Sequence, residues 1–366
     1  MRIKLAVLVV LLAVVAAACG GDDDADSTTN TSGELGEGAA IATPDDLPDL
    51  SGESLTFVAF GGQGQELQAQ AWIDPFAEAT GADVRQDSPS DIAKLVAQVE
   101  SGNVDWDVVA TDPYFPQSGC GEIAEKIDID LSALDQRYVT DECSVPVDRF
   151  TYHLVYNEEL FGDDPPTGWD AYFDTEKYPG KRGIWSYVGQ NQLEFALLAD
   201  GVAPDDVYPI DIPRAIAKLD TIKDDVVPFD TLAQSVEQVL ADEVVMSIMV
   251  NTRSYAAIAQ GAHFTPMWKN NIQSWDSFII PKGSKNKEAA EAFLQFLTTE
   301  TAQQNILNVL PFAPTREGSF ESGNAELIPF SPGSDEVEQD AILQDQDYYA
   351  EHFEEVNEAY NAWLAG

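Results

Sequence analysis

Segments with the periodicity of strands and of helices alternate along most of the chain. Residues 54–60 are rich in β-branched and aromatic side chains and end at Gly61, which predicts a strand. Residues 65–79 and 92–101 carry apolar side chains three and four positions apart, which predicts helices. Residues 106–111 predict the next strand. Strand, helix and strand at this spacing indicate right-handed βαβ units, and therefore an α/β fold with a parallel sheet covered on both faces.

A second set of such segments follows a run of loop residues. Residues 182–187 and 244–250 predict strands, and residues 211–222 predict a helix with proline in its first turn. The C-terminal stretch places large apolar side chains three and four positions apart, which is typical of a helix packed against a core. The members of this face are Tyr349, Phe353, Val356, Tyr360 and Trp363.

The first nineteen residues have the pattern of an export signal. Arg2 and Lys4 precede an uncharged stretch that is too short to span a bilayer as a helix. Small residues then lead to Cys19, whose thiol suits lipid attachment, as in bacterial lipoprotein signals; an ordinary secretory signal with an accidental cysteine is the alternative. We expect 1–18 to be a signal peptide and 19–52 to be a lipid-anchored, disordered acidic linker. The mature protein would be exported and held at the outer face of the cell membrane, or in the periplasm, through this anchor only.

The chain is strongly acidic, with 64 Asp and Glu against 19 Lys and Arg and a net charge of −45. This excludes nucleic acid as a partner, because phosphate contacts need clustered basic residues. Two interpretations of the acidity stay open. It is either a general adaptation of the surface, which the even spread of acids along the chain favours, or a field that steers cationic ligands inward.

Motifs for chemistry are mostly absent from the sequence. Two cysteines remain after Cys19, and in an exported chain Cys120 and Cys143 predict a disulfide. We expect no metal site, because the histidines are scattered, and no cofactor, because no phosphate-binding loop occurs. No spacing singles out a pair of catalytic carboxylates, so we do not expect an enzyme.

Several segments together resemble a bacterial ABC-transporter solute-binding protein of the spermidine/putrescine-binding family. They run in family order over nearly the whole folded region: FVAFGG at 57–62, DPFAEATGADV at 74–84, WDVVAT at 106–111, PTGWDAYFDTEKYPGKRG at 166–183, LEFALLADGV at 193–202, WDSFIIPKGSKNKEAAEAFLQFL at 275–297 and LPFAPTR at 310–316. The resemblance implies two α/β lobes around a ligand cleft, joined by hinge strands that we expect near 151–157 and 277–282. Lobe 1 would be 53–154 and 277–320. Lobe 2 would be 155–276 and 321–366, ending in the C-terminal helix.

The resemblance also implies the ligand contacts. In this family a polyamine lies between aromatic rings with carboxylates on its ammonium groups, and Asp276 matches the acid that meets one ammonium. Three positions depart from the pattern: Asn191 replaces a frequent carboxylate, Val250 replaces an aromatic residue, and Arg253 adds a positive charge. The implied ligand-binding residues are Phe60, Gly61, Gly62, Gln63, Thr111, Asp112, Ser186, Tyr187, Gln190, Asn191, Asn251, Arg253, Trp275, Asp276 and Phe312.

These observations predict the substrate-binding subunit of an ABC importer, which captures a small amine, with putrescine or spermidine first, and delivers it to a membrane permease served by a separate ATPase. We expect a monomer. The alternatives are a sensory receptor of the same fold, a binder of another solute and, less favoured, a secreted hydrolase.

Overall fold

The computed structural model describes residues 41–43, 45, 47–318, 320 and 323–366, all within one compact unit. The predicted signal peptide, Cys19 and the first part of the predicted linker lie outside the described residues. Within the described ranges no helix is both long enough and apolar enough to cross a membrane.

One sheet of ten strands organises the fold, and its first three strands form the parallel arrangement that the βαβ pattern predicts. The main path of the sheet is β2-β1-β3-β8-β4-β7-β5-β6. The strands β1 (Ser54–Val58), β2 (Asp83–Asp87) and β3 (Val108–Thr111) are parallel. Between them run α1 (Gly62–Gln68), the π-helical turn η1 (Ala69–Ile73), α2 (Asp74–Thr80) and α3 (Ile92–Ser101). We call these elements, with α4 (Tyr114–Gly119), α11 (Lys287–Leu297) and α12 (Glu300–Leu307), the first lobe.

The other end of the sheet repeats this arrangement and forms the second lobe. Strands β5 (Arg182–Trp185), β6 (Val226–Phe229) and β7 (Met246–Val250) are parallel in the order β7-β5-β6. The helices of this lobe are α5 (Glu158–Phe161), α6 (Asp170–Phe173), α7 (Gln192–Ala199), α8 (Ile212–Asp220), α9 (Leu232–Leu240), α10 (Asn251–Ala259) and α14 (Gln346–Ala365), with short turns η2 (Val188–Gln190), η3 (Pro204–Asp206) and η4 (Lys223–Asp225).

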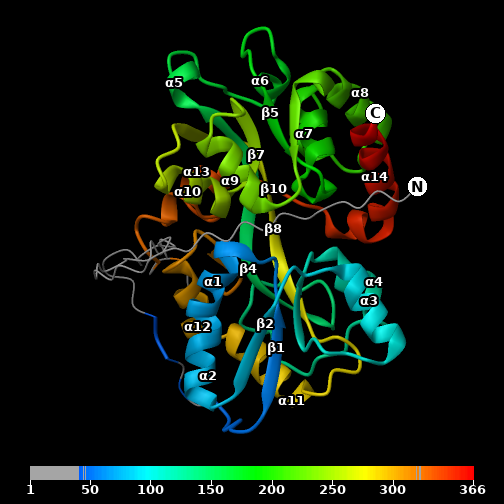
Figure 1. The fold of residues 1–366 in the computed structure, drawn as a ribbon, viewed down its shortest axis with the longest axis vertical. Helices are drawn as coiled ribbons and strands as arrows, with labels where there is room; N and C mark the ends of the chain where they lie inside the picture. The colour runs from blue at the N-terminus through cyan, green and yellow to red at the C-terminus, as the bar shows by residue number, and fades with distance from the viewer. Residues whose placement is uncertain (1–40, 44, 46, 319, 321–322) are drawn as a thin grey trace, which may run out of the picture. The chain divides into compact units, whose positions relative to one another are not determined.

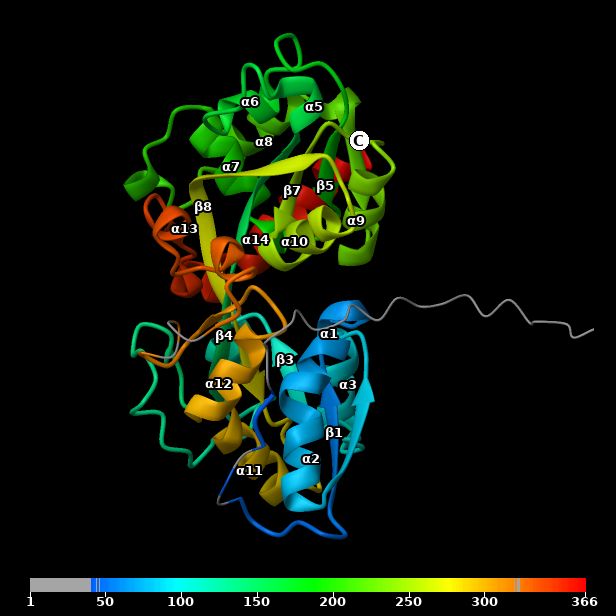
Figure 2. The same ribbon diagram turned by 90° about the vertical axis from the view of Figure 1, so that its left-hand side faces the viewer.

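Two long antiparallel strands, β4 (Ser144–Asn157) and β8 (Phe264–Ile279), run from one lobe into the other (Figures 1 and 2). β8 pairs with β3 in the first lobe, and β4 pairs with β7 in the second. Both strands are longer than the predicted crossing segments, because buried polar residues such as Asp148 and Asn271 interrupt the apolar pattern that sequence analysis follows. The smaller elements beside them are β9 (Ala313–Pro314), η6 (Ile328–Phe330), α13 (Asp335–Glu338) and β10 (Ile342–Leu343).

The cores of the lobes explain why these elements stay in place. In the first lobe Trp72 Nε1 donates to the carbonyl of Ala302, 2.9 Å away, and the ring of Phe76 meets that of Phe293 at 5.0 Å. In the second lobe Trp169 stacks on Phe195 at 3.6 Å. The predicted C-terminal helix is present as α14, and four of its five predicted core residues are buried: Tyr349, Val356, Tyr360 and Trp363.

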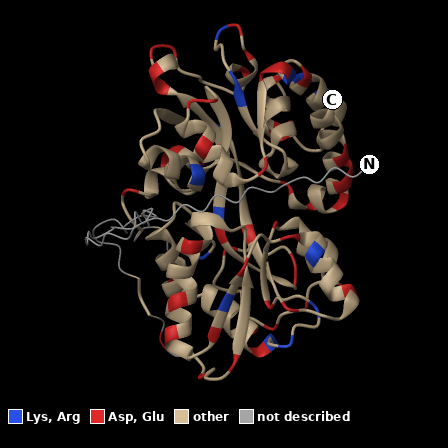
Figure 3. Ribbon diagram, in the orientation of Figure 1, with Lys and Arg blue, Asp and Glu red and all other residues tan. Residues whose placement is uncertain are grey.

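The predicted disulfide is confirmed: Cys120 and Cys143 are bonded, with 2.03 Å between the sulfur atoms. The bond fastens the end of α4 to the residue just before β4. Figure 3 shows acidic residues on elements of both lobes and few basic ones, so the charge is not confined to one region of the described chain.

Candidate functional site

A cavity of about 80 Å³ lies where the two lobes face each other. It is built by the carboxyl ends of two parallel strands from each lobe, which is where open α/β sheets place their ligands. Phe60 and Gly61 follow β1, Asp112 follows β3, Tyr187 follows β5 and Arg253 follows β7. The other lining residues are Gly64, Gln65, Gln68, Phe150, Tyr152, Trp185, Leu232, Val250, Thr252, Asp276, Leu310 and Phe312.

A larger hollow, of about 710 Å³, lies elsewhere on the surface. It is lined mainly by the segment 340–347 together with Arg137 and Asp205, and no parallel strand end of either lobe opens into it. We therefore take the smaller cavity as the candidate site, because it combines aromatic walls, buried charges and residues from both lobes.

Two glycines begin the first-lobe wall. Gly61 and Gly62 have φ values of +79° and +65°, a backbone conformation that favours glycine. The turn brings the N–H of Gly61 to Oε1 of Gln65, 3.0 Å away, and Gln65 Nε2 donates to the carbonyl of Asp87. Gln65 is thereby fixed at the cavity while Phe60, 40% exposed, stands at its edge.

Asp112 is held by tyrosines from both lobes. Tyr187 donates a hydrogen bond to Asp112 Oδ2 at 3.0 Å, Tyr114 donates to the same oxygen at 3.3 Å, and the two phenol oxygens lie 2.7 Å apart. Burial raises the pKa of the Asp112 carboxyl, and the two phenolic hydrogen bonds oppose that shift. Gly189 makes room for this arrangement, since a Cβ there would lie 2.3 Å from the Tyr187 ring.

Arg253 places a positive charge in the same cavity. It belongs to α10 of the second lobe, yet its Nη2 would lie 3.1 Å from a Cβ built on Gly64 of the first lobe. Within the described ranges the guanidinium has no hydrogen bond and no acidic partner, and its Nε is buried. Burial alone lowers the pKa of Arg253. Arg253 as a whole is partly exposed at the cavity, so its unpaired guanidinium is available to an anionic group that enters the site.

Asp276 supplies a carboxyl group on the β8 wall. It is 5% exposed and lies opposite Asp148 of β4 in the ladder. Burial, followed by the charge of Asp112, raises the pKa of Asp276 to about 8. Tyr152, directly before a bulge of β4, also lines the cavity; burial, followed by the charges of Asp112 and Asp276, raises the pKa of its phenol. Aromatic, acidic and basic groups thus surround one small space.

The sequence-predicted site residues divide into two groups. Phe60, Gly61, Asp112, Tyr187, Arg253, Asp276 and Phe312 line the cavity, and Gly62 approaches Arg253 beside it. The other seven do not line it. Gln63 is exposed on α1, and Gln190 is fully buried without a hydrogen-bond partner in the described chain.

The remaining five make contacts elsewhere. Thr111 donates to the carbonyl of Ser277, Asn191 donates to Glu194, and Ser186 bonds Asp230. Asn251 ties together three backbone segments, through the N–H of Thr151 and the carbonyls of Pro311 and Phe330. Trp275 packs edge-on against Tyr138 and borders the larger hollow instead.

Sequence analysis missed several residues of the site. Phe150 and Tyr152 share one face of β4, but the predicted strand began at residue 151 and its alternation was not followed upstream. Gln65 and Gln68 lie three positions apart on α1 and are its two buried residues, and this helical spacing was a usable signal. Tyr114 gave none, because its contact with Tyr187 joins residues 73 positions apart. Among the described residues no group of three or more His, Cys, Asp or Glu is arranged to hold a metal ion.

Comparison with known proteins gives a consistent result. The family described as bacterial extracellular solute-binding protein matches residues 71–343. A gamma-aminobutyric acid-binding protein of Pseudomonas aeruginosa is 30% identical over 86% of this chain and 91% of its own length. A solved GABA receptor is 34% identical, with a TM-score of 0.78 over 85% of this chain and 98% of its own. An ABC transporter substrate-binding protein from Bradyrhizobium japonicum is 29% identical, with a TM-score of 0.79 over 85% and 99%.

Proposed function

The chain belongs to the bacterial extracellular solute-binding proteins and is the substrate-binding protein of an ABC transporter, and we propose that its solute is a small zwitterion with one ammonium and one carboxylate group. Proteins of this family deliver small molecules to a membrane permease and are not enzymes. The two-lobed fold with its crossing strands β4 and β8 is the one expected from the sequence.

The observation that carries this proposal is the unpaired guanidinium of Arg253 in a cavity that Asp112 and Asp276 also line. The acids suit an ammonium group, and Arg253 suits a carboxylate, which it binds with two parallel N–H donors. A diamine such as putrescine fits less well, because its second ammonium would share this small cavity with the like charge of Arg253. We therefore favour a zwitterion over the polyamine that the sequence suggests.

The size of the cavity and the nature of the relatives support the same choice. A volume of about 80 Å³ is well below the ~300–1,000 Å³ of pockets for drug-sized ligands, which favours a short solute. One similar protein is described as binding gamma-aminobutyric acid (GABA) and another as a GABA receptor. GABA is a four-carbon amino acid with its charges at opposite ends. Phe60, Phe150 and Phe312 offer apolar surface to a short alkyl chain. GABA is thus the first solute to test.

Calorimetric titration tests the proposal with three four-carbon solutes: GABA, putrescine and butyrate. We expect GABA to bind at least tenfold more tightly than either of the others, since only GABA pairs both signs of charge. Arg253→Met should weaken GABA binding by ~2–5 kcal/mol, the cost of leaving a buried charge unpaired. Arg85→Met serves as the matched control, because Arg85 pairs with Asp83 at an exposed site. A preference for putrescine in the parent protein would contradict the zwitterion and restore the polyamine.

The attachment to the membrane is a separate proposal. We propose that Cys19 carries a lipid after removal of residues 1–18, because small residues and an uncharged stretch precede it. Cys19→Ser should move the protein from the membrane fraction to the soluble exported fraction. Equal membrane retention of the variant would contradict the anchor.

If instead the protein serves a sensor, deleting its gene would abolish the response to the solute and leave uptake unchanged.

A further inference from the structure

The carboxyl group of Asp148 is buried but has no hydrogen-bond donor within the described residues. Asp148 on β4 lies directly across the ladder from Asp276 on β8, and on its other side β4 pairs with Pro314 of β9. Its side chain is 0% exposed, and neither carboxyl oxygen meets a hydrogen-bond donor anywhere in the described chain. Buried polar groups in native proteins nearly always have a partner, so this one needs an explanation.

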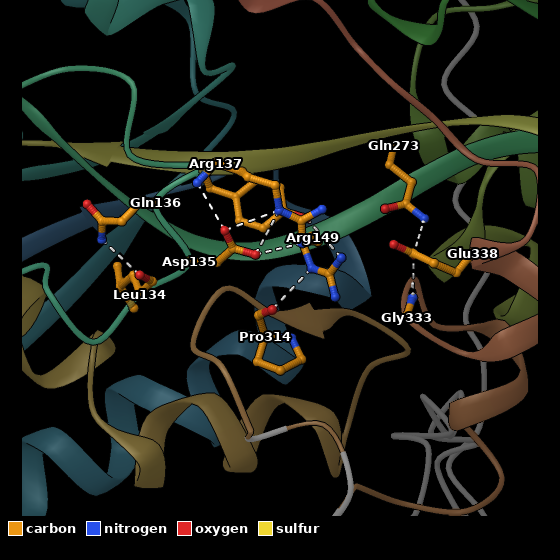
Figure 4. Close-up of polar contacts among 10 residues, drawn as sticks. Leu134, Asp135, Gln136, Arg137, Arg149, Gln273, Pro314, Gly333 and Glu338 are labelled. Carbon is orange, nitrogen blue, oxygen red and sulfur yellow. Dashed lines mark hydrogen bonds and ion pairs between the residues drawn. The ribbon is translucent and has the colours of Figure 1, made fainter. Parts of the chain in front are cut away.

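The neighbouring cation does not compensate Asp148. Arg149 follows it on β4, and side chains of successive strand residues point to opposite faces. The guanidinium of Arg149 donates from Nε to the carbonyl of Pro314 at 3.1 Å and from Nη1 to Tyr138, and its charge acts on Asp135 (Figure 4). The cavity cation Arg253 does not neutralise it either, since the cavity is lined by Asp276 and not by Asp148.

An ionised Asp148 would therefore be a buried charge without donor, cation or water-exposed surface, which is prohibitively costly. Two ionised carboxylates offer only lone pairs to each other, but a single proton between them satisfies both. We propose that Asp148 is a neutral carboxylic acid that donates a hydrogen bond to Asp276 and thereby positions Asp276 as the single carboxylate that meets the ammonium group of the solute. The part concerning the ammonium rests on the proposed function; the proton shared by the two acids does not.

The electrostatics of the surroundings agree with this geometry. Burial, then the charge of Asp276, raises the pKa of Asp148 well above its ordinary value, whereas the hydrogen bond from Asp148 opposes the upward shift at Asp276. The other titratable groups facing the pair are Asp112 and Tyr152, with Arg253 on the cavity wall. Asp112 keeps its own donors, Tyr187 and Tyr114, and is not part of the shared proton.

This arrangement has a consequence for selectivity. A pair that holds one proton carries at most one negative charge, so it is matched to one ammonium group and not to two. Asp148 is then a positioning residue. It acts in its neutral form, as a hydrogen-bond donor to Asp276, and not as a negative charge. Asn is nearly the same size as Asp and supplies a neutral donor through its amide. Leu has the same branched shape, is larger, and supplies no donor.

The test compares Asp148→Asn with Asp148→Leu by titrating GABA at several pH values. We expect Asp148→Asn to bind GABA within about threefold of the parent with the same pH profile. Asp148→Leu should bind at least tenfold more weakly at pH 7, and the pH at which its affinity is half-maximal should move upward, because Asp276 has lost its donor. A loss of tenfold or more in folded Asp148→Asn would overturn the proposal, since it would mean that Asp148 acts as an anion.

A second measurement needs no solute and stays decisive if Asp148→Leu does not fold. Infrared difference spectra of the solute-free parent and Asp148→Asn should show one buried protonated carboxylic acid that the variant lacks. Asp141→Asn is the matched control: Asp141 is a partly buried acid that accepts from Ser144 and from the N–H of Cys143, so its removal should leave that band in place. Absence of the band in the parent overturns the shared proton. Its presence without GABA binding would contradict only the proposed solute.

Discussion

The hydroxyl of Tyr187 donates a hydrogen bond to Oδ2 of Asp112 at 3.0 Å, although the two residues follow strands of different lobes. Tyr114 completes the contact from the first lobe, and its ring stacks on Phe353 of α14 at 4.8 Å. These polar and aromatic contacts join the lobes at the edge of the cavity. They exist only when the lobes are close, so they favour the arrangement that encloses a solute.

Tyr187→Phe should therefore weaken solute binding more than it weakens the fold. The variant keeps the ring but removes the donor to a carboxylate, a loss of about 1.5–3 kcal/mol that falls mainly on the closed arrangement. We expect about tenfold or greater loss of GABA affinity by calorimetry and a nearly unchanged urea midpoint. Tyr255→Phe is the control, because Tyr255 contacts Phe330 through its ring and makes no hydrogen bond within the described ranges. An unchanged affinity in Tyr187→Phe would show that this contact does not favour closure.

The disulfide between Cys120 and Cys143 should contribute to stability and not to binding. It closes a loop across 23 positions, for which the chain-entropy treatment gives about 3 kcal/mol. The double variant Cys120→Ala with Cys143→Ala should lower the free energy of unfolding by roughly that amount in urea titrations. Reductant should destabilise the parent and leave the double variant unaffected. Equal stability of parent and double variant would contradict a structural role.

His153 should make stability depend on pH. Its ring is 0% exposed, contacts Trp268 at 4.2 Å, and burial lowers the pKa of His153 to about 3. Below pH 6.5 the His153 side chain binds a proton in the unfolded chain but not in the folded protein. The free energy of unfolding therefore decreases as the pH falls from 6.5 toward 3. The cost at pH 5 is about 2 kcal/mol relative to pH 7, from 1.36 kcal/mol per pH unit.

His153→Phe should remove that part of the pH dependence. The ring contact with Trp268 is kept, and the variant should lose about 2 kcal/mol less stability than the parent between pH 7 and pH 5 in urea titrations. The buried acids titrate in both proteins and cancel in this difference. His263→Gln is the control, since His263 is exposed. If the free energy of unfolding of the parent and of His153→Phe changed equally with pH, the pKa of His153 would be the same in the folded and unfolded protein, which would contradict the prediction.

Much of the fold could be predicted from the sequence, because the patterns that mark its strands and helices involve neighbouring residues. Glycine after β1 and the helical spacing of 65–79 and 92–101 identify elements from neighbouring residues alone, and the disulfide followed from the number of cysteines. The crossing strands were placed only in part. Their buried polar residues, such as Thr151 and Gln273, are satisfied by partners far along the chain, which no local pattern reveals.

The same distinction applies to the site. Residues that directly follow strands, such as Phe60, Asp112 and Tyr187, were predicted and do line the cavity. Asn251 and Thr111 were predicted on the same grounds, but their side chains hold backbone segments together instead. Strand position fixes where a residue lies and not where its side chain points. That direction depends on long-range partners such as the carbonyl of Pro311, 60 positions from Asn251.

Gly64→Ala should separate affinity from stability, because the two effects have opposite signs. Gly64 lies inside α1 without a positive φ, so alanine there should stabilise the helix by about 0.5–1 kcal/mol. Its Cβ would lie 3.1 Å from Nη2 of Arg253, which must then shift by a few tenths of an ångström away from the position in which it meets a carboxylate. We expect GABA affinity to fall by about three- to tenfold, roughly 1 kcal/mol, while the urea midpoint rises slightly. Gly119→Ala is the control, since Gly119 is the last residue of α4 and its Cβ would make an ordinary 3.5 Å contact with Ile123, beyond that helix. If Gly64→Ala binds GABA as tightly as the parent, the guanidinium of Arg253 is not held against this helix when the solute is bound.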